Sequence, residues 1–115
     1  MKPFVLIVED DEGIKEALEI ALRVKGLNIS SRETLLPEEL DQAPDLILLD
    51  VSLFGTSGKD ICSTLKNNPE TAHIPVLMMS ASPSQQAACI AAGANDFITK
   101  PFRLSDLINR IYNLI

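Results

Sequence analysis

Short apolar runs alternate along the chain with longer segments in which apolar residues recur every three or four positions. The short runs are typical of strands buried on both faces of a sheet, and the longer segments are typical of helices with one buried face. The run at 27–30 is polar at its end, so we place it at the edge of the sheet. The predicted strands cover residues 5–8, 27–30, 45–49, 74–79 and 95–98.

Helices are predicted between the strands and after the last one. Acidic residues or proline in a first turn favour a helix start, and glycine just past a last turn favours a helix end. Strands and helices that alternate in this way predict an α/β fold, with a parallel sheet between two layers of helices. The predicted helices run from Asp11 or Glu12 to Gly26, over 37–40, over 59–66, from Ser82 to Gly93 and from Leu104 onward.

The composition is that of one folded domain with an acidic surface. The chain has 115 residues, of which 46% are hydrophobic, and this size and composition predict a single domain. Its 16 acidic and 10 basic residues give a net charge of −6, which argues against direct binding to nucleic acid or to an anionic membrane. No stretch is long and apolar enough for a membrane span or a signal peptide, so we expect a cytoplasmic protein.

Neither the cysteines nor the histidine predicts a metal or redox site. Cys62 and Cys89 lie in apolar helical patterns with no third cysteine or histidine nearby, so we expect two free thiols that pack as small apolar side chains. His73 lies in a turn before a strand and is expected to be an ordinary loop residue.

Polar residues follow four of the predicted strands at the point where each strand ends. In an open α/β sheet, ligands bind beyond the carboxyl ends of the strands, so we expect these side chains to form one site. They are Glu9, Asp10 and Asp11 after the first strand, Asp50 after the third, Ser80 after the fourth and Lys100 after the fifth. Asp11 also stands at a helix start, and we favour that role for it over metal binding.

Carboxylates gathered at one edge need a cation. Two carboxylates about 4 Å apart repel each other by ~4 kcal/mol at an effective dielectric constant of about 20. Mg²⁺ suits such a cluster because it binds through one or two carboxylates together with water and phosphate oxygens. An aspartate can also accept a phosphoryl group, and a lysine and a hydroxyl beside it can stabilise the charge of that group. The pattern therefore predicts a phosphoryl-accepting aspartate with a magnesium site.

Four motifs in this order resemble the receiver domain of two-component response regulators. They are V-E-D-D at 8–11, L-L-D followed by G-x-x-G at 48–58, M-M-S-A-S at 78–82 and G-A-N-D-F-I-T-K-P-F at 93–102. The resemblance covers essentially the whole chain, so we expect residues 1–115 to form one receiver domain. It implies a flavodoxin-like, doubly wound (βα)5 sandwich whose five-stranded parallel sheet has the order 2-1-3-4-5.

The resemblance also implies a role for each acidic residue of the site. Asp50 is the expected phosphoacceptor, which receives its phosphoryl group from a histidine of a sensor kinase or phosphotransfer protein. Glu9 and Asp10 match the acidic pair of the family, and Asp10 is the expected direct ligand of Mg²⁺, with Mn²⁺ as an alternative ion. Asp50 and the main-chain carbonyl of Ser52 complete the expected ligands from the protein.

The remaining matched residues are expected to bind the phosphoryl group or to report it to a partner. Lys100 matches the lysine that pairs with the aspartate or with its phosphoryl group, and the Lys100–Pro101 peptide bond is expected to be cis. Ser80 and Phe97 match the switch pair, in which the hydroxyl moves toward the phosphoryl group and the ring turns inward. This movement is expected to reshape the surface of the fourth helix, fifth strand and fifth helix, where a downstream protein target or a separate output domain would bind.

Other functions remain as alternatives. A metal-dependent phosphohydrolase would carry a second acid two residues after its aspartate, where this chain has Ser52, so we expect no turnover enzyme beyond self-catalysed phosphorylation and dephosphorylation of Asp50. A flavodoxin-type binder is disfavoured, because the first loop is acidic and unsuited to a phosphate. A docking module that works without phosphorylation is the main alternative. Phe54 stands where many receivers have proline, so the loop after Asp50 is expected to differ in shape.

Overall fold

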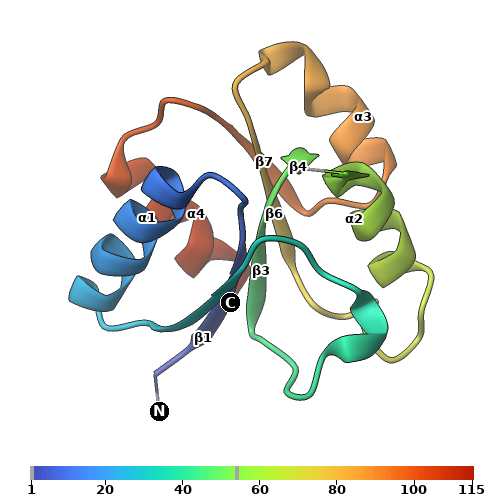
Figure 1. Cartoon of the computed structure of the whole chain (residues 1–115), viewed down its shortest axis with the longest axis horizontal. Coiled ribbons are helices and arrows are strands. Elements are labelled where there is room, and N and C mark those ends of the chain that lie inside the picture. Colours follow the sequence, from blue (N-terminus) through green and yellow to red (C-terminus); the bar gives the residue numbers. More distant parts are fainter. Residues whose placement is uncertain (1, 54) are drawn as a thin grey trace.

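The fold is a parallel sheet with helices on both faces, in a computed structural model that describes residues 2–53 and 55–115 (Figure 1). Every neighbouring pair in the five-stranded sheet is parallel. The predicted order is confirmed, and the polar strand β2 lies at the edge as expected. From that edge the strands are β2 (Asn28–Arg32), β1 (Phe4–Val8), β3 (Leu46–Asp50), β6 (Val76–Ser80) and β7 (Asp96–Thr99).

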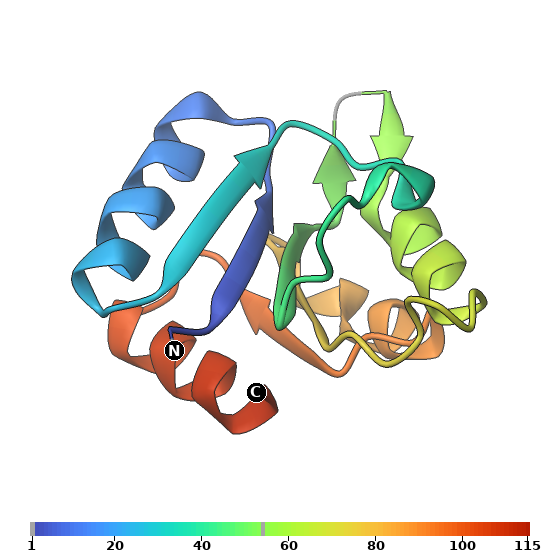
Figure 2. The ribbon, with the colours of Figure 1, turned by 90° about the horizontal axis from the view of Figure 1, so that it is seen from below.

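Two helices cover each face of the sheet. α1 (Glu12–Val24) and α4 (Leu104–Leu114) lie on one face, and α2 (Gly58–Lys66) and α3 (Gln86–Ala91) lie on the other (Figures 1 and 2). Alternate residues of β1 divide between the two cores. Val5 and Ile7 pack on the side of α1 and α4, whereas Leu6 and Val8 pack on the side of α2 and α3. This two-sided burial explains why the central strands are continuously apolar.

The second crossover is shorter than expected. The helix predicted over 37–40 is a single 3₁₀ turn, η1 (Pro37–Glu39), so the prediction of five α-helices is wrong at this place. Pro37 starts the turn, but the apolar side chains around it do not recur at helical spacing over a second turn. The core is covered here by the side chain of Leu35, which is 2% exposed, and not by the face of a helix.

The segment after β3 is a small hairpin rather than an irregular loop. β4 (Ser52–Leu53) pairs antiparallel with β5 (Thr56–Ser57), and Gly55 supplies a positive φ of 77° between them. Phe54, whose effect on this loop was expected from the sequence, lies outside the described residues. The hairpin leads directly into α2, which therefore begins close to Asp50.

The remaining helix predictions are confirmed, with one change of detail. Gly26 and Gly93 follow α1 and α3 with positive φ angles of 84° and 106°. The helix expected from Ser82 begins as a 3₁₀ turn, η2 (Pro83–Gln85), before α3 continues it. Cys62 and Cys89 are free and buried, as expected. Within the described ranges, no helix has the length and apolar character needed to cross a membrane.

Candidate functional site

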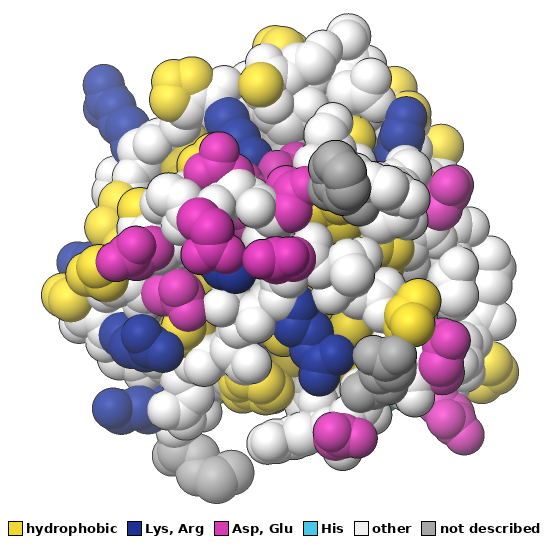
Figure 3. All heavy atoms as spheres, in the orientation of Figure 1, with side chains coloured by type: hydrophobic (Ala, Val, Ile, Leu, Met, Phe, Trp, Pro, Cys, Tyr) yellow, Lys and Arg dark blue, Asp and Glu magenta, His cyan; other side chains and the backbone are white. Residues whose placement is uncertain are grey.

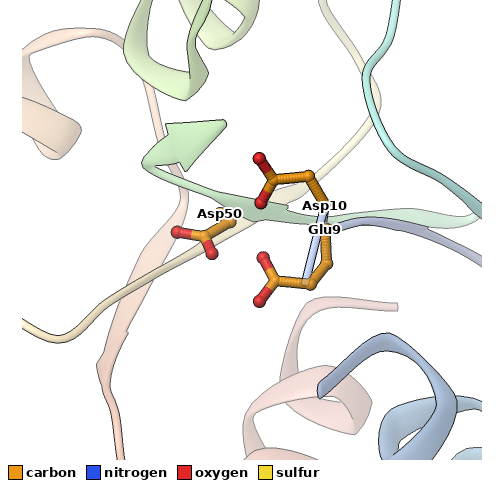
Figure 4. Close-up of side chains that lie close together, drawn as sticks. All are labelled: Glu9, Asp10 and Asp50. Atoms are coloured by element: carbon orange, nitrogen blue, oxygen red, sulfur yellow. The ribbon is translucent and has the colours of Figure 1, made fainter. Parts of the chain in front are cut away.

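Three carboxylates meet where β1 and β3 end. Val8 pairs with Leu49, and this register places the following Glu9 next to Asp50 at the edge of the sheet. One oxygen from each of Glu9, Asp10 and Asp50 lies within 4.8 Å of the others, and Figure 4 shows the Glu9 and Asp10 carboxylates extending toward the Asp50 side. Glu9 is fully buried and Asp50 is 6% exposed, so water does little to reduce the repulsion between them.

Lys100 reaches this cluster from β7, two strands away from β3. Its Nζ donates to Asp50 Oδ2 at 2.6 Å and to Glu9 Oε1 at 3.0 Å. The backbone of Lys100 is fixed by a hydrogen bond from its N–H to the carbonyl of Ser80 at 2.8 Å. The Lys100–Pro101 bond is cis, as the resemblance implied. One amine therefore serves two buried carboxylates, which leaves the cluster with excess negative charge.

The cluster distributes its protons unevenly. Burial and the neighbouring Asp50 carboxylate raise the pKa of Glu9 to about 8, although Lys100 acts in the opposite direction. Burial acts to raise the pKa of Asp50 too, but Glu9, Lys100 and the Ser52 N–H together hold it below its ordinary value. Burial acts to lower the pKa of Lys100, and its two carboxylate partners outweigh that effect and raise it. Asp50 therefore stays ionised, and Glu9 is the group that keeps a proton.

The donor set fits a hard divalent cation. Glu9 Oε2 is buried and has no hydrogen-bond partner among the described residues, which is costly for a polar atom. The three carboxylates supply oxygen atoms only, and these are the ligands that Mg²⁺ prefers. A bound cation would both neutralise the excess charge and give the orphaned oxygen a partner.

The backbone around Asp50 holds its carboxylate in a set position. The N–H of Ser52 donates to Asp50 Oδ1 at 3.1 Å, while Oδ2 accepts from Lys100. The first turn of α2 packs against the Asp50 carbonyl so closely that a Cβ at Gly58 would collide with the carbonyl oxygen. The N–H of Gly58 also donates to the carbonyl of Val51 at 2.8 Å. Glycine at 58 therefore allows the helix to start directly beside the site.

The other predicted residues lie around the cluster. Ser80 is 6% exposed, and its Oγ accepts from the N–H of Ser82 at 3.0 Å. Phe97 is 4% exposed and packs in the core beneath α2 and α3, so its ring is already inward in this structure. Asp11 caps α1 by accepting from the N–H of Ile14 at 2.9 Å, which confirms that it serves the helix.

Lys59 and Gln85 lie near the site and were missed by the sequence analysis. Lys59 Nζ donates to Gln85 Oε1 at 2.9 Å, which joins the first turn of α2 to the η2 turn after β6. The position of Lys59, one residue after the Gly58 that opens α2, was the only signal available. A lysine in a first helical turn is ordinarily read as an exposed side chain.

Acidic side chains dominate the surface around this edge. Figure 3 shows them gathered over the end of β1 and the first turn of α1. This surface favours cationic ligands near the cluster and disfavours anions that approach from the side of α1.

Comparison with known proteins identifies the family. A family model described as the response regulator receiver domain matches residues 5–112. The chain belongs to this family. It is 34% identical to the phosphate regulon transcriptional regulatory protein PhoB of Rhizobium meliloti, over 96% of this chain and 51% of that protein. It is 35% identical to the sensory transduction protein RegX3 of Mycolicibacterium smegmatis, over 93% of this chain and 48% of that protein.

A solved receiver-like structure supports the same assignment. A putative response regulator from Chloroflexus aurantiacus has a TM-score of 0.93 and 32% identity, over 99% of this chain and 98% of that chain. The chain spans about half the length of the curated relatives, so this receiver domain corresponds to one part of those proteins. Receiver domains of response regulators are signalling proteins rather than turnover enzymes, and they bind Mg²⁺ at an acidic pocket of the kind formed here by Glu9, Asp10 and Asp50.

Proposed function

We propose that residues 1–115 act as one phosphoacceptor receiver domain of a phosphorelay, in which Asp50 takes a phosphoryl group from a histidine of a sensor kinase or phosphotransfer protein. The observation that carries the proposal is the position of the Asp50 carboxylate. One of its oxygens accepts from the Ser52 N–H and the other from Lys100. The Asp50 carboxylate also belongs to the acidic cluster, whose oxygen atoms fit a divalent cation.

The residues of the site divide the chemistry between them. Glu9, Asp10, Asp50 and the carbonyl of Ser52 would hold Mg²⁺, which supplies positive charge to the transferring phosphoryl group. Asp50 is ionised and can act as the nucleophile, since its pKa is held low. Before phosphorylation Lys100 pairs with the Asp50 carboxylate, and after phosphorylation it would pair with the oxygen atoms of the phosphoryl group on Asp50. Ser80, at the end of the strand beside β3, would donate a hydrogen bond to the same group.

Phosphorylation is proposed to act on the surface of α3, β7 and α4 through Ser80 and Phe97. Arg110 links Phe97 to this surface, because its Nη1 donates to the Phe97 carbonyl at 2.8 Å and to Asp96 at 3.0 Å. A groove of about 630 Å³ lies on the same surface and is lined by Phe97, Phe102, Arg103 and Arg110 among others. A small shift at Phe97 would therefore change the shape of a surface that a downstream protein or output domain can bind.

A second groove suits the protein that brings the phosphohistidine. This groove, of about 430 Å³, is predominantly apolar and runs between α1 and the segment that follows Lys100. An apolar surface on α1 and on the segment just after Lys100 would let a partner dock without adding charge to the site. Its lining residues include Ile14, Ala17, Ala21, Pro101, Phe102 and Leu104.

The test is the intact mass of the protein after incubation with acetyl phosphate, with and without Mg²⁺. We expect a gain of one phosphoryl group that needs Mg²⁺ and is lost in Asp50→Asn. Asp60→Asn, which changes an exposed acid in the first turn of α2, is the matched control and should be phosphorylated like the wild type. If the wild type gains no phosphoryl group under any condition, the docking module that works without phosphorylation becomes the better account.

A further inference from the structure

A second pocket adjoins Asp50 on the side of β6, away from the acidic pair at the end of β1. It has a volume of about 400 Å³ and lies between the β4–β5 hairpin, the start of α2 and the loop that enters η2. Five of its lining residues carry a hydroxyl group, and Lys59 and Gln85 complete the polar part. The five are Ser52, Thr56, Ser57, Ser80 and Ser82. None of the described residues that line it is acidic, in contrast to the cluster on the other side of Asp50.

Lys59 gives this pocket an uncompensated positive charge. Its Nζ donates to Gln85 Oε1 at 2.9 Å, and that acceptor is a neutral amide. No ion pair of Lys59 with an acidic group occurs in the described part of the chain. An ammonium group in a pocket that is also lined by hydroxyl-bearing residues favours an anionic, oxygen-rich ligand.

We propose that this pocket is a subsite for the leaving group of small acyl phosphates, with Lys59 as the residue that selects an anionic leaving group. The proposal rests on the proposed role of Asp50 as the phosphoacceptor. An acyl phosphate at Asp50 meets carboxylates on the side of β1 and hydroxyl and ammonium groups on the side of β6. The charges on the two sides therefore favour an orientation in which the acyl oxygen, where negative charge develops as the carboxylate leaves, points toward Lys59.

Two phosphodonors with different leaving groups can separate an effect of Lys59 on the leaving group from an effect on phosphorylation in general. With acetyl phosphate, an Asp50 oxygen forms a bond to phosphorus, the bond between phosphorus and the acyl oxygen breaks, and acetate leaves with that electron pair and its negative charge. With phosphoramidate, the phosphorus–nitrogen bond breaks and the already protonated nitrogen leaves as neutral ammonia. Lys59 attracts the first leaving group and gains nothing from the second.

The experiment compares the rate constants of Asp50 phosphorylation by acetyl phosphate and by phosphoramidate, at saturating Mg²⁺, from intact masses of quenched samples. For Lys59→Met we expect the ratio of the acetyl phosphate to the phosphoramidate rate constant to fall about fivefold, within the range by which local charge alters the association of ions. Added salt should reduce the difference between Lys59→Met and the wild type, because it screens exposed charges.

Two control variants separate charge at the pocket from other effects. Lys25→Met removes the same charge from the exposed far end of α1 and should keep the ratio of the wild type. Gln85→Ala removes the hydrogen bond to Lys59 but keeps the ammonium group, so it should not lower the ratio as Lys59→Met does.

Each outcome bears on one proposal only. An unaltered ratio in Lys59→Met would overturn the proposed subsite. An equal fall of the ratio in Gln85→Ala would also overturn it, because Lys59 would then act only by holding the η2 turn. Failure of both donors to phosphorylate the wild type would instead count against the proposed role of Asp50.

Discussion

The carboxyl edge of the sheet has two halves with opposite chemistry. β1 and β3 end in the carboxylates of Glu9, Asp10 and Asp50, whereas β6 and β7 end in the hydroxyl of Ser80 and the amine of Lys100. The first half is poorly satisfied by itself, because Glu9 Oε2 is buried without a hydrogen-bond partner among the described residues. The second half supplies the donors, and Lys100 is the direct link between the two. The difference fits an edge that receives a cation on the acidic side, and it supports the proposal that a phosphoryl group binds between the two halves.

Substitution of Lys100 tests the contact between the two halves of the edge, and among the variants considered it should have the largest effect on stability. In Lys100→Met, two buried carboxylates lose their shared partner, so we expect the free energy of unfolding to fall by about 3–5 kcal/mol without divalent ions. Urea unfolding measures this loss. The matched control is Lys15→Met, which breaks an ion pair with the exposed Glu12 and should cost about 1 kcal/mol or less. If both variants lose the same free energy of unfolding, the ion pairs of Lys100 contribute no more than an ordinary ion pair at the surface.

The link through Lys100 also marks the limit of what the sequence predicted. The order of the strands followed from the resemblance to receiver domains. The strands and all four polar strand ends could be predicted from the pattern, because an apolar run that stops at a polar residue marks both the strand and its edge. The sharing of Lys100 between Glu9 and Asp50 could not, since it depends on a side chain that crosses the intervening strand β6. Pairing over 91 residues of chain leaves no local pattern.

Two local features were missed for a different reason. The 3₁₀ turn at Pro37 and the hydrogen bond from Lys59 to Gln85 both depend on how neighbouring segments pack. A proline followed by two acidic residues favours a helix start equally well whether one turn or three follow. A lysine in a first helical turn has no sequence feature that tells whether it faces solvent or a pocket.

Substitution of Asp10 tests the acidic half alone, and we expect it to change Mg²⁺ affinity with a smaller effect than the loss of Lys100. Asp10→Asn keeps the shape of the side chain but removes one negative charge from the cluster, so the dissociation constant for Mg²⁺ should rise about tenfold or more. Because an ion that binds only the folded state stabilises it, the affinity can be measured from the rise in Tm with Mg²⁺ concentration. Glu70→Gln, which changes an exposed acid beyond the last turn of α2, provides the control for a distant loss of the same charge. An unaltered affinity in Asp10→Asn would remove this residue from the proposed ligands.

The pH dependence of stability at Glu9 tests whether the carboxylates of the acidic half repel one another when no cation is bound. The pKa of Glu9 is about 8 in the folded protein and 4.5 in its unperturbed form, so the folded state holds the proton more tightly. The stability from this proton is fully present below pH 4.5 and is lost as the pH rises toward 8. The low pKa of Asp50 affects stability only in more acidic solution, below this window.

We therefore expect the Tm of the wild type in a chelator to fall between about pH 5 and pH 8 more steeply than that of Glu9→Gln, which has no group to ionise there. Glu16→Gln, which changes an exposed acid on α1, should follow the wild type. Mg²⁺ should reduce the fall in the wild type, because the cation takes the place of the proton. If Glu9→Gln and the wild type fall in parallel, Glu9 is already ionised at neutral pH without a cation, and Lys100 by itself balances the acidic half.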